Sequence, residues 1–167
     1  REENSPYDLN VHLRQDAQRA IRLIRSNAAR WNVDPNRIGI MGFSAGGEVV
    51  SMVAYESGEG DAQATDPVER ESARVQFQIQ VYPGPVGMPE RVPDDAPPAF
   101  FLCARDDGAL KNIDYMYNLY RQANRPVELH VLHGGGHGFN MGTRSKLQSV
   151  KNWPDRLIDW LSDQGWN

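Results

Sequence analysis

The sequence predicts an α/β fold in which a mostly parallel sheet of about four strands carries helices on both faces. Three observations predict this class. Apolar segments with helical spacing alternate along the chain with short apolar runs typical of strands. The motif Gly42-Phe43-Ser44-Ala45-Gly46 joins a strand-like run to a helix-like run. Other candidate reactive residues also follow strand-like runs, and the carboxyl ends of parallel strands meet at the edge where such sheets bind ligands.

The first half of the chain contains two expected helices and one expected strand. Residues 8–31 are expected to form one helix, because their apolar side chains fall on one face and arginines lie elsewhere. A strand is expected at 37–41, followed by the glycine-flanked turn and a helix that runs to about residue 55. Residues 56–73 are rich in Gly, Asp and Glu and are expected to form a surface excursion.

The second half alternates in the same way. Residues 75–82 are expected to form a strand, and its alternating glutamines predict a face less completely covered than that of a central strand. A loop rich in Pro and Gly spans 83–98, and the apolar run 98–104 predicts a buried strand. A helix is expected at 111–124, a strand at 127–132 and a last helix at 145–164.

Length and composition limit the classes of protein to which the chain can belong. Its 167 residues suit a single domain, 1–167. The net charge is −4 without a run of Lys or Arg, so nucleic acid is not an expected partner, and no apolar stretch approaches a membrane span. Cys103 is interpreted as a small core residue. We find no zinc-type Cys/His cluster, P-loop or dinucleotide motif, so we expect no metal and no cofactor. The sequence indicates no compartment.

Ser44 is the candidate nucleophile, in a turn whose flanking glycines are expected to avoid collisions with backbone. A serine hydroxyl needs a base, usually histidine, and a carboxylate that orients the base. In hydrolases with this strand–turn–helix motif the acid and then the histidine follow the serine, which excludes His12. His130 lies within a strand and is interpreted as facing solvent or a helix. We favour His137, inside a glycine-rich loop, and interpret His133 as a positioning or structural residue.

The candidate acid follows the expected strand at 98–104. Asp106 and Asp107 are adjacent and point in different directions, so one of them is expected to serve. We favour Asp107 and keep Asp106 as the alternative, whose other interpretation is a turn or helix-cap residue. Ser44, Asp107 and His137 all come after strand ends, so they are expected at one edge of the sheet.

Three segments resemble α/β-hydrolases, in particular the esterase- and lipase-like members that include acetyl-xylan and other carbohydrate acylesterases. They are residues 31–47 around the serine, 97–100 before the acid and 135–139 around the base. The resemblance covers nearly the whole chain. It implies hydrolysis of a small-molecule acyl ester through an acyl-enzyme, with Ser44 as nucleophile, His137 as base and then acid, and Asp107 as the group that orients it. It also implies that the backbone N–H of Ala45 is one oxyanion donor.

The sequence departs from that family upstream of the serine. The family usually takes a second oxyanion donor from a His-Gly-Gly-Gly-type loop. Here His12 is followed by Leu13, and the only glycines before Ser44 are Gly39 and Gly42. The sequence therefore predicts a truncated α/β-hydrolase fold, either the C-terminal portion or a naturally shortened form. A shortened sheet leaves an edge strand to be covered, which predicts a homodimer.

The leading expectation is a serine esterase for short-chain acyl esters, of the carboxylesterase or acetylesterase type. One alternative is a non-catalytic hydrolase-like remnant that acts in binding or assembly. A less favoured one is a prolyl-peptidase-like serine hydrolase, since this sequence carries no large gating domain. Tyr82 is a candidate substrate contact, with packing of a strand-end aromatic on a helix as its other interpretation. Phe139 and Asn140, beside His137, are further candidates.

Overall fold

The computed structural model of the protein describes residues 8–56 and 58–166. Four strands form one sheet in the order β1-β2-β3-β4, and every neighbouring pair is parallel. The strands are β1 (Gly39–Phe43), β2 (Phe77–Val81), β3 (Ala99–Ala104) and β4 (Val127–Leu132). The predicted parallel sheet of an α/β protein is thus confirmed.

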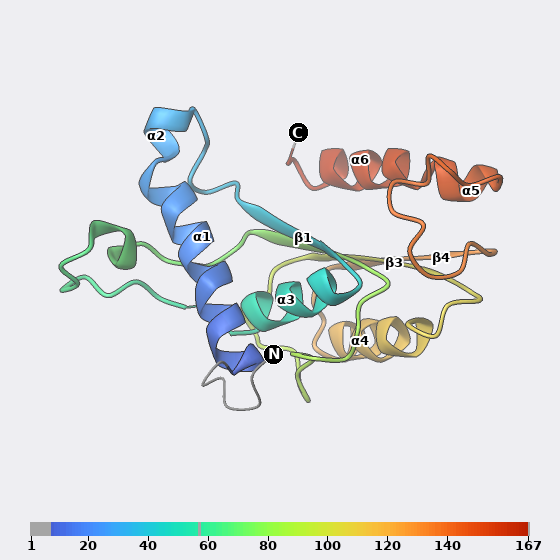
Figure 1. Ribbon diagram of the computed structural model, residues 1–167, viewed down its shortest axis with the longest axis horizontal. Helices are drawn as coiled ribbons and strands as arrows, with labels where there is room; N and C mark the ends of the chain where they lie inside the picture. Colours follow the sequence, from blue (N-terminus) through green and yellow to red (C-terminus); the bar gives the residue numbers. More distant parts are fainter. Residues whose placement is uncertain (1–7, 57, 167) are drawn as a thin grey trace, which may run out of the picture.

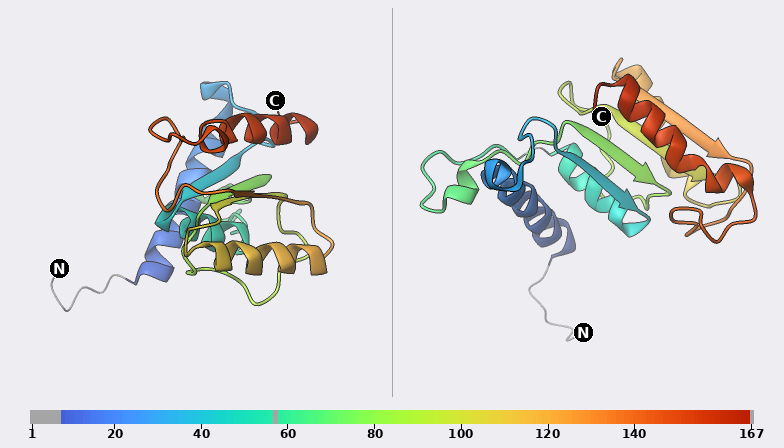
Figure 2. Two further views of the ribbon diagram at one scale, coloured as in Figure 1. Left: turned by 90° about the vertical axis from the view of Figure 1, so that its right-hand side faces the viewer. Right: turned by 90° about the horizontal axis from the view of Figure 1, so that it is seen from above.

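Helices cover both faces of this sheet, as the alternation predicted (Figures 1 and 2). One face carries α3 (Ala45–Ala54) and α4 (Leu110–Gln122), and the opposite face carries α5 (Gln148–Lys151) and α6 (Trp153–Asp163). The chain enters through the π-helical turn η1 (Leu9–Leu13), followed by α1 (Arg14–Ser26) and α2 (Ala28–Trp31). Helix α1 packs against α3, with Ile21 and Val53 in a small apolar cluster between them.

Strand β3 supplies both halves of the core. All six of its residues are buried, in agreement with the strand predicted there. Consecutive side chains of a strand point to opposite faces. The Phe100 ring accordingly lies 5.6 Å from that of Trp160 on α6, and the Phe101 ring lies 5.5 Å from that of Tyr120 on α4.

The glutamines of β2 are fully buried, so the expectation of a less covered face was wrong. Gln78 and Gln80 are 0% exposed. The Gln80 amide donates a hydrogen bond to Gln78 Oε1 (2.7 Å), the Tyr55 hydroxyl donates to the same oxygen (3.2 Å), and the Gln78 amide donates to the Tyr120 hydroxyl. Burial raises the pKa of both tyrosines, which keeps their hydroxyls protonated. The glutamines thus avoid the cost of unpaired buried polar groups.

Both long predicted helices are broken, each at an asparagine. The helix expected at 8–31 ends at Ser26, because the Asn27 side chain donates to the Leu23 carbonyl (2.9 Å) and its backbone leaves the helical region (φ −104°, ψ 10°). The helix expected at 145–164 is divided at Asn152 (φ −98°, ψ 4°). Pro154 follows in the first turn of α6, where its missing N–H is tolerated.

The segment at 56–73 contains a short 3₁₀ helix, η2 (Pro67–Arg70), docked on α1. Arg19 pairs with Asp66 at 2.8 Å and Arg22 pairs with Glu69 at 3.1 Å. The first pair is exposed and the second is partly buried, and together they hold the surface excursion predicted from its composition to the helix beside it.

Cys103 of β3 is 0% exposed, and burial raises the pKa of its thiol to about 12. The thiol therefore stays protonated near neutral pH and packs as a core side chain, in agreement with the interpretation from the sequence.

Candidate active site

Ser44 occupies a strained turn between β1 and α3. Strand β1 extends two residues beyond the predicted 37–41, because its register with β2 runs to the pair Phe43–Val81. Ser44 has φ 53° and ψ −119°, a conformation that costs a residue with a Cβ about 1–3 kcal/mol. Its N–H donates to the Val81 carbonyl (3.0 Å), and its own carbonyl accepts from the N–H of Gly47 (2.9 Å). These bonds hold the hydroxyl at the carboxyl end of the sheet.

The glycines around Ser44 have different roles. A Cβ on Gly42 would lie 2.1 Å from the Gly46 carbonyl oxygen, so only glycine fits there. A Cβ on Gly46 would meet no atom of the described residues within 4 Å, so the expected collision at this position was wrong. Gly47 is a second position where a side chain would collide, because an added Cβ would lie 2.7 Å from Cβ of Pro83.

Ser44, His137 and Asp107 form a continuous hydrogen-bonded chain. The Ser44 Oγ lies 2.8 Å from His137 Nε2, and His137 Nδ1 lies 2.8 Å from Asp107 Oδ2. The Asp107 side chain is 3% exposed, and its other oxygen accepts from the Ala109 N–H (2.8 Å). A carboxylate at Nδ1 favours the tautomer with the proton on that nitrogen, which leaves Nε2 to accept from the serine hydroxyl.

The residues before Asp107 hold the loop that carries His137. Asp106 Oδ1 accepts a hydrogen bond from the Gly136 N–H (2.9 Å), and Arg105 Nε donates to the His133 carbonyl (3.2 Å). The hydrogen bond from Gly136 lowers the pKa of the Asp106 carboxyl. Asp106 is therefore more than the turn or cap residue that the sequence suggested, since it contacts the backbone directly before His137.

The other histidines lie away from Ser44 in different settings. His130 Nε2 lies 2.6 Å from Glu128 Oε1, and its ring packs near Phe100 at 5.1 Å. His133 is exposed at the end of β4, and its carbonyl accepts the Arg105 hydrogen bond described above. His12 Nδ1 lies 2.8 Å from the Asp8 amide nitrogen in the first helical turn.

Tyr82 packs beneath His137. It is 1% exposed, and its ring centroid lies 4.7 Å from that of His137 and 4.7 Å from that of Phe139. Its hydroxyl accepts from the Asn140 N–H (2.9 Å) and donates to the Asn140 side-chain oxygen (3.2 Å). Of the two interpretations made from the sequence, this placement matches the packed aromatic, although the partners come from the histidine loop.

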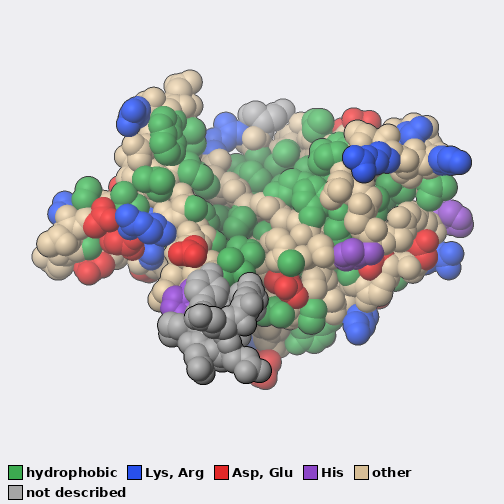
Figure 3. Space-filling view, in the orientation of Figure 1, with side chains coloured by type: hydrophobic (Ala, Val, Ile, Leu, Met, Phe, Trp, Pro, Cys, Tyr) green, Lys and Arg blue, Asp and Glu red, His purple; other side chains and the backbone are tan. Residues whose placement is uncertain are grey.

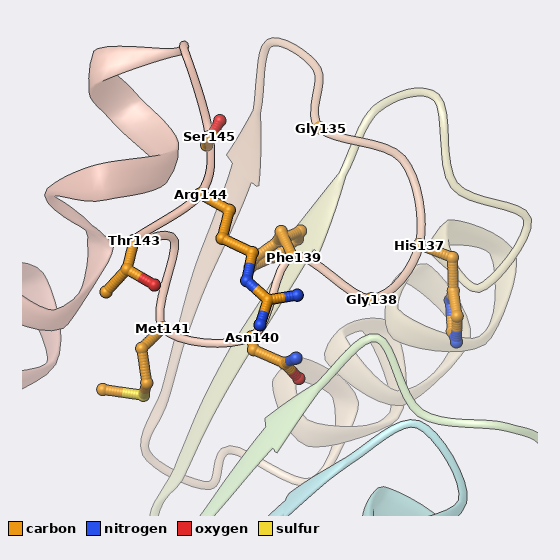
Figure 4. A pocket seen from close by; sticks show the side chains of 9 residues that line it. All are labelled: Gly135, His137, Gly138, Phe139, Asn140, Met141, Thr143, Arg144 and Ser145. Carbon is orange, nitrogen blue, oxygen red and sulfur yellow. The ribbon is translucent and has the colours of Figure 1, made fainter.

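A cavity of about 540 Å³ opens beside His137 (Figure 4). Phe139 and Asn140, both expected near substrate, line it; Ser44 and Tyr82 are not among its lining residues. The full wall consists of Gly135, His137, Gly138, Phe139, Asn140, Met141, Thr143, Arg144 and Ser145. Sequence reasoning did not find the part after Asn140, although the absence of Asp and Glu from 129–154 marks this segment as distinct in a chain with net charge −4.

Ala45 is the first residue of α3, and the first amides of a helix have no partner inside it. Its N–H is therefore available at the turn that carries Ser44. Within residues 8–56 and 58–166, no cluster of three or more His, Cys, Asp or Glu side chains could hold a metal ion. Among the helices described there, none combines the length and apolarity needed to cross a membrane.

Comparison with known proteins shows the family to which the chain belongs. The BD-FAE family matches residues 11–90. The crystal structure of an acetyl ester-xyloside bifunctional hydrolase from Caldicellulosiruptor lactoaceticus superposes with a TM-score of 0.87 at 30% identity, covering 97% of this chain and 69% of that one. The chain belongs to the esterase-like α/β-hydrolases. This confirms the resemblance and the α/β-hydrolase fold predicted from the sequence, and this chain spans only part of the length of the matched structure.

Two curated relatives and a further solved structure also match the chain. An acetylxylan esterase of Xylanibacter ruminicola is 30% identical over an alignment 178 positions long, gaps included, which covers 83% of this chain and 34% of the relative. Endo-1,4-beta-xylanase B of Butyrivibrio fibrisolvens is 26% identical, with 76% of this chain and 24% of the relative covered. The chain thus spans about a third of the length of the first curated relative and about a quarter of that of the second. An esterase from Thermogutta terrifontis, with a TM-score of 0.76 at 20% identity, shares the fold.

Proposed function

We propose that this chain hydrolyses short-chain acyl esters through Ser44, His137 and Asp107. The observation that carries the proposal is the unbroken hydrogen-bonded chain, with both heavy-atom separations at 2.8 Å. The acetylxylan esterase and acetyl ester-xyloside hydrolase among its relatives support a small acyl group. We propose both the carboxylesterase activity and the roles of these three residues.

The proposed reaction begins when His137 Nε2 accepts the hydroxyl proton and Ser44 Oγ attacks the ester carbonyl carbon. The carbonyl electrons move to oxygen, which receives a hydrogen bond from the Ala45 N–H. As the tetrahedral intermediate collapses, the bond from carbon to the alcohol oxygen breaks, and His137 gives its proton to that oxygen. Water then attacks the acyl-enzyme in the same way and releases the acid and the serine. Asp107 stabilises the imidazolium in both halves.

The chain before Ser44 contains no counterpart of the family's His-Gly-Gly-Gly loop. Loss of one oxyanion donor lowers turnover by about 10²- to 10³-fold in measured cases. The activity test separates a catalytic chain from the alternative of a non-catalytic remnant.

The test combines labelling with turnover. We expect a fluorophosphonate probe to modify the chain once, at Ser44, because only an activated serine reacts quickly with it. We also expect hydrolysis of p-nitrophenyl acetate and butyrate and no hydrolysis of a prolyl peptide anilide. A folded chain that neither takes the label nor turns over either ester would support the remnant, and cleavage of the anilide would support a peptidase.

Asp106 provides a prediction about the position of the base. Replacement of Asp106 by alanine is expected to lower kcat for p-nitrophenyl acetate by about 10-fold with little change in KM, because the loop that carries His137 loses an anchor. Asp106→Asn keeps an oxygen that can accept from the Gly136 N–H, so it should recover most of the loss. Steady-state kinetics of the two variants would check this. Equal losses in both, or a loss confined to KM, would contradict the positioning role.

We keep the homodimer as part of the proposal. Among the described residues, β1 pairs with another strand on one side only, and Met41 within it is 38% exposed. Figure 3 shows hydrophobic side chains gathered between α2 and α6, on the side of β1. Sedimentation velocity is expected to show a dimer at micromolar concentration, and Met41→Lys should shift it toward monomer. A chain that is monomeric and fully active would refute this part.

A further inference from the structure

The cavity beside His137 lies where the alcohol part of an ester would sit, if the proposed function holds. In that reaction His137 gives its proton to the alcohol oxygen, so the alcohol must extend from a point next to the imidazole. His137 borders the cavity, whereas Ser44 and Ala45 do not. The cavity therefore belongs to the leaving-group side of the site. At about 540 Å³ it falls within the range of small-molecule sites, roughly 300–1,000 Å³.

The wall of the cavity combines an apolar part with several polar groups. Phe139 and Met141 supply the apolar surface, and Asn140, Thr143 and Ser145 supply hydrogen-bonding groups. Arg144 lines the same cavity as Phe139 and Asn140, and Figure 4 shows all three side chains there. Such a wall suits a hydroxylated ligand better than an alkyl chain, because an alkyl chain would leave these polar groups without partners.

The charge of this wall is not neutralised locally. Arg144 makes no ion pair or hydrogen bond with the described part of the chain. Residues 129–154 contain three cations, Arg144, Lys146 and Lys151, and no Asp or Glu. The two carboxylates that follow β3 have other partners, since Asp106 accepts from the Gly136 N–H and Asp107 is paired with His137. A guanidinium with free donors matches the geometry of a carboxylate.

We propose that this cavity selects acyl esters whose alcohol part is a hydroxylated carboxylate, such as an acidic sugar. Arg144 binds the carboxylate, and Asn140, Thr143 and Ser145 contact the hydroxyl groups. Phe139 and Met141 cover the apolar face of the ring. Arg144 is then a specificity-determining residue for the leaving group and takes no part in proton transfer.

The test uses a matched pair of substrates, monoacetylated galacturonic acid and monoacetylated galactose, with p-nitrophenyl acetate as a reference that lacks both sugar and carboxylate. The expected ratio of kcat/KM, acid over neutral sugar, is about 10, as for a hydrogen-bonded but partly solvated ion pair. Arg144→Gln should bring this ratio close to 1, mainly through KM for the acid, and Arg144→Glu should invert it. Added salt should weaken the preference in the unaltered chain.

Lys146→Gln is the matched control, because Lys146 carries the same charge in the same loop and does not line the cavity. It should leave the ratio unchanged. A ratio near 1 in the unaltered chain, with p-nitrophenyl acetate still cleaved, would overturn this inference and leave the proposed esterase intact. If Lys146→Gln and Arg144→Gln changed the ratio equally, the preference would come from the positive charge of the surface in general. That result would also overturn the inference.

Binding of galacturonate itself supplies a readout that does not need turnover. When the isotope-labelled chain is titrated with galacturonate, the NMR signals of the Gly138 and Asn140 amides are expected to shift. Galactose should shift them less. The difference should vanish in Arg144→Gln. If the chain cleaves no ester but shows this difference, the proposed function fails while the subsite remains. If galacturonate and galactose bind equally or not at all, the subsite is refuted.

Discussion

Replacing Ser44 with alanine is expected to lower kcat for p-nitrophenyl acetate by about 10⁴-fold or more, to the level left by binding and oxyanion stabilisation alone. The reason is that no other hydroxyl lies within hydrogen-bonding distance of His137 Nε2 among the described residues. The backbone should keep its positive φ with serine or with alanine at position 44, so the fold should be retained. Initial rates with both p-nitrophenyl esters, beside a thermal melting curve, would measure the effect.

Ser51→Ala is the matched control for this change. Ser51 lies on the same helix, α3, and its hydroxyl is buried against Gln80 at 3.4 Å, away from the imidazole. The variant should keep its turnover, although it loses a weak hydrogen bond. If Ser44→Ala retained more than about a tenth of the activity, the acyl-enzyme route would be untenable, since the nucleophile accounts for most of the rate in such enzymes.

Replacing Asp107 with asparagine is expected to lower kcat by about 10⁴-fold. The buried carboxylate accepts a hydrogen bond from His137 Nδ1–H and so selects the tautomer whose Nε2 can take the serine proton. An amide at this position can instead donate to Nδ1 and favour the opposite tautomer, which has a proton on Nε2 facing Ser44. The same p-nitrophenyl acetate assay would check this.

Asp106→Asn makes the same chemical change one residue earlier. Its carboxylate contacts the Gly136 N–H and not the imidazole, and an amide oxygen can accept that bond, so the variant should keep most of its turnover. Comparison of Asp107→Asn with Asp106→Asn separates two effects. One is the change of the His137 tautomer, and the other is the general effect of removing a negative charge. If Asp106→Asn were the more damaging change, the assignment of the acid would have to be reversed.

The fold class, the positions of the strands along the chain and the candidate nucleophile could all be predicted from the sequence alone. The strands at 127–132 and β3 lie where the sequence predicted them. The first shows the local period of two of a strand, and the second is an unbroken apolar run, as expected for a strand buried on both faces. The turn at Ser44 could be found as well, since its signal is contained in five consecutive residues. The broken helices were missed because an asparagine that bonds its own backbone does not disturb the apolar period.

Which of several chemically equivalent residues come into contact is seen only in the folded protein. Asp106 and Asp107 are the same side chain on consecutive residues, and the packing of β3 against β4 places one under the His137 loop backbone and the other against its ring. The burial of Gln78 likewise depends on a tyrosine far along the chain. The cavity with Arg144 arises where the loop after β4 folds back. Contacts across many residues depend on how the layers pack, and a periodic pattern in the sequence carries no record of them.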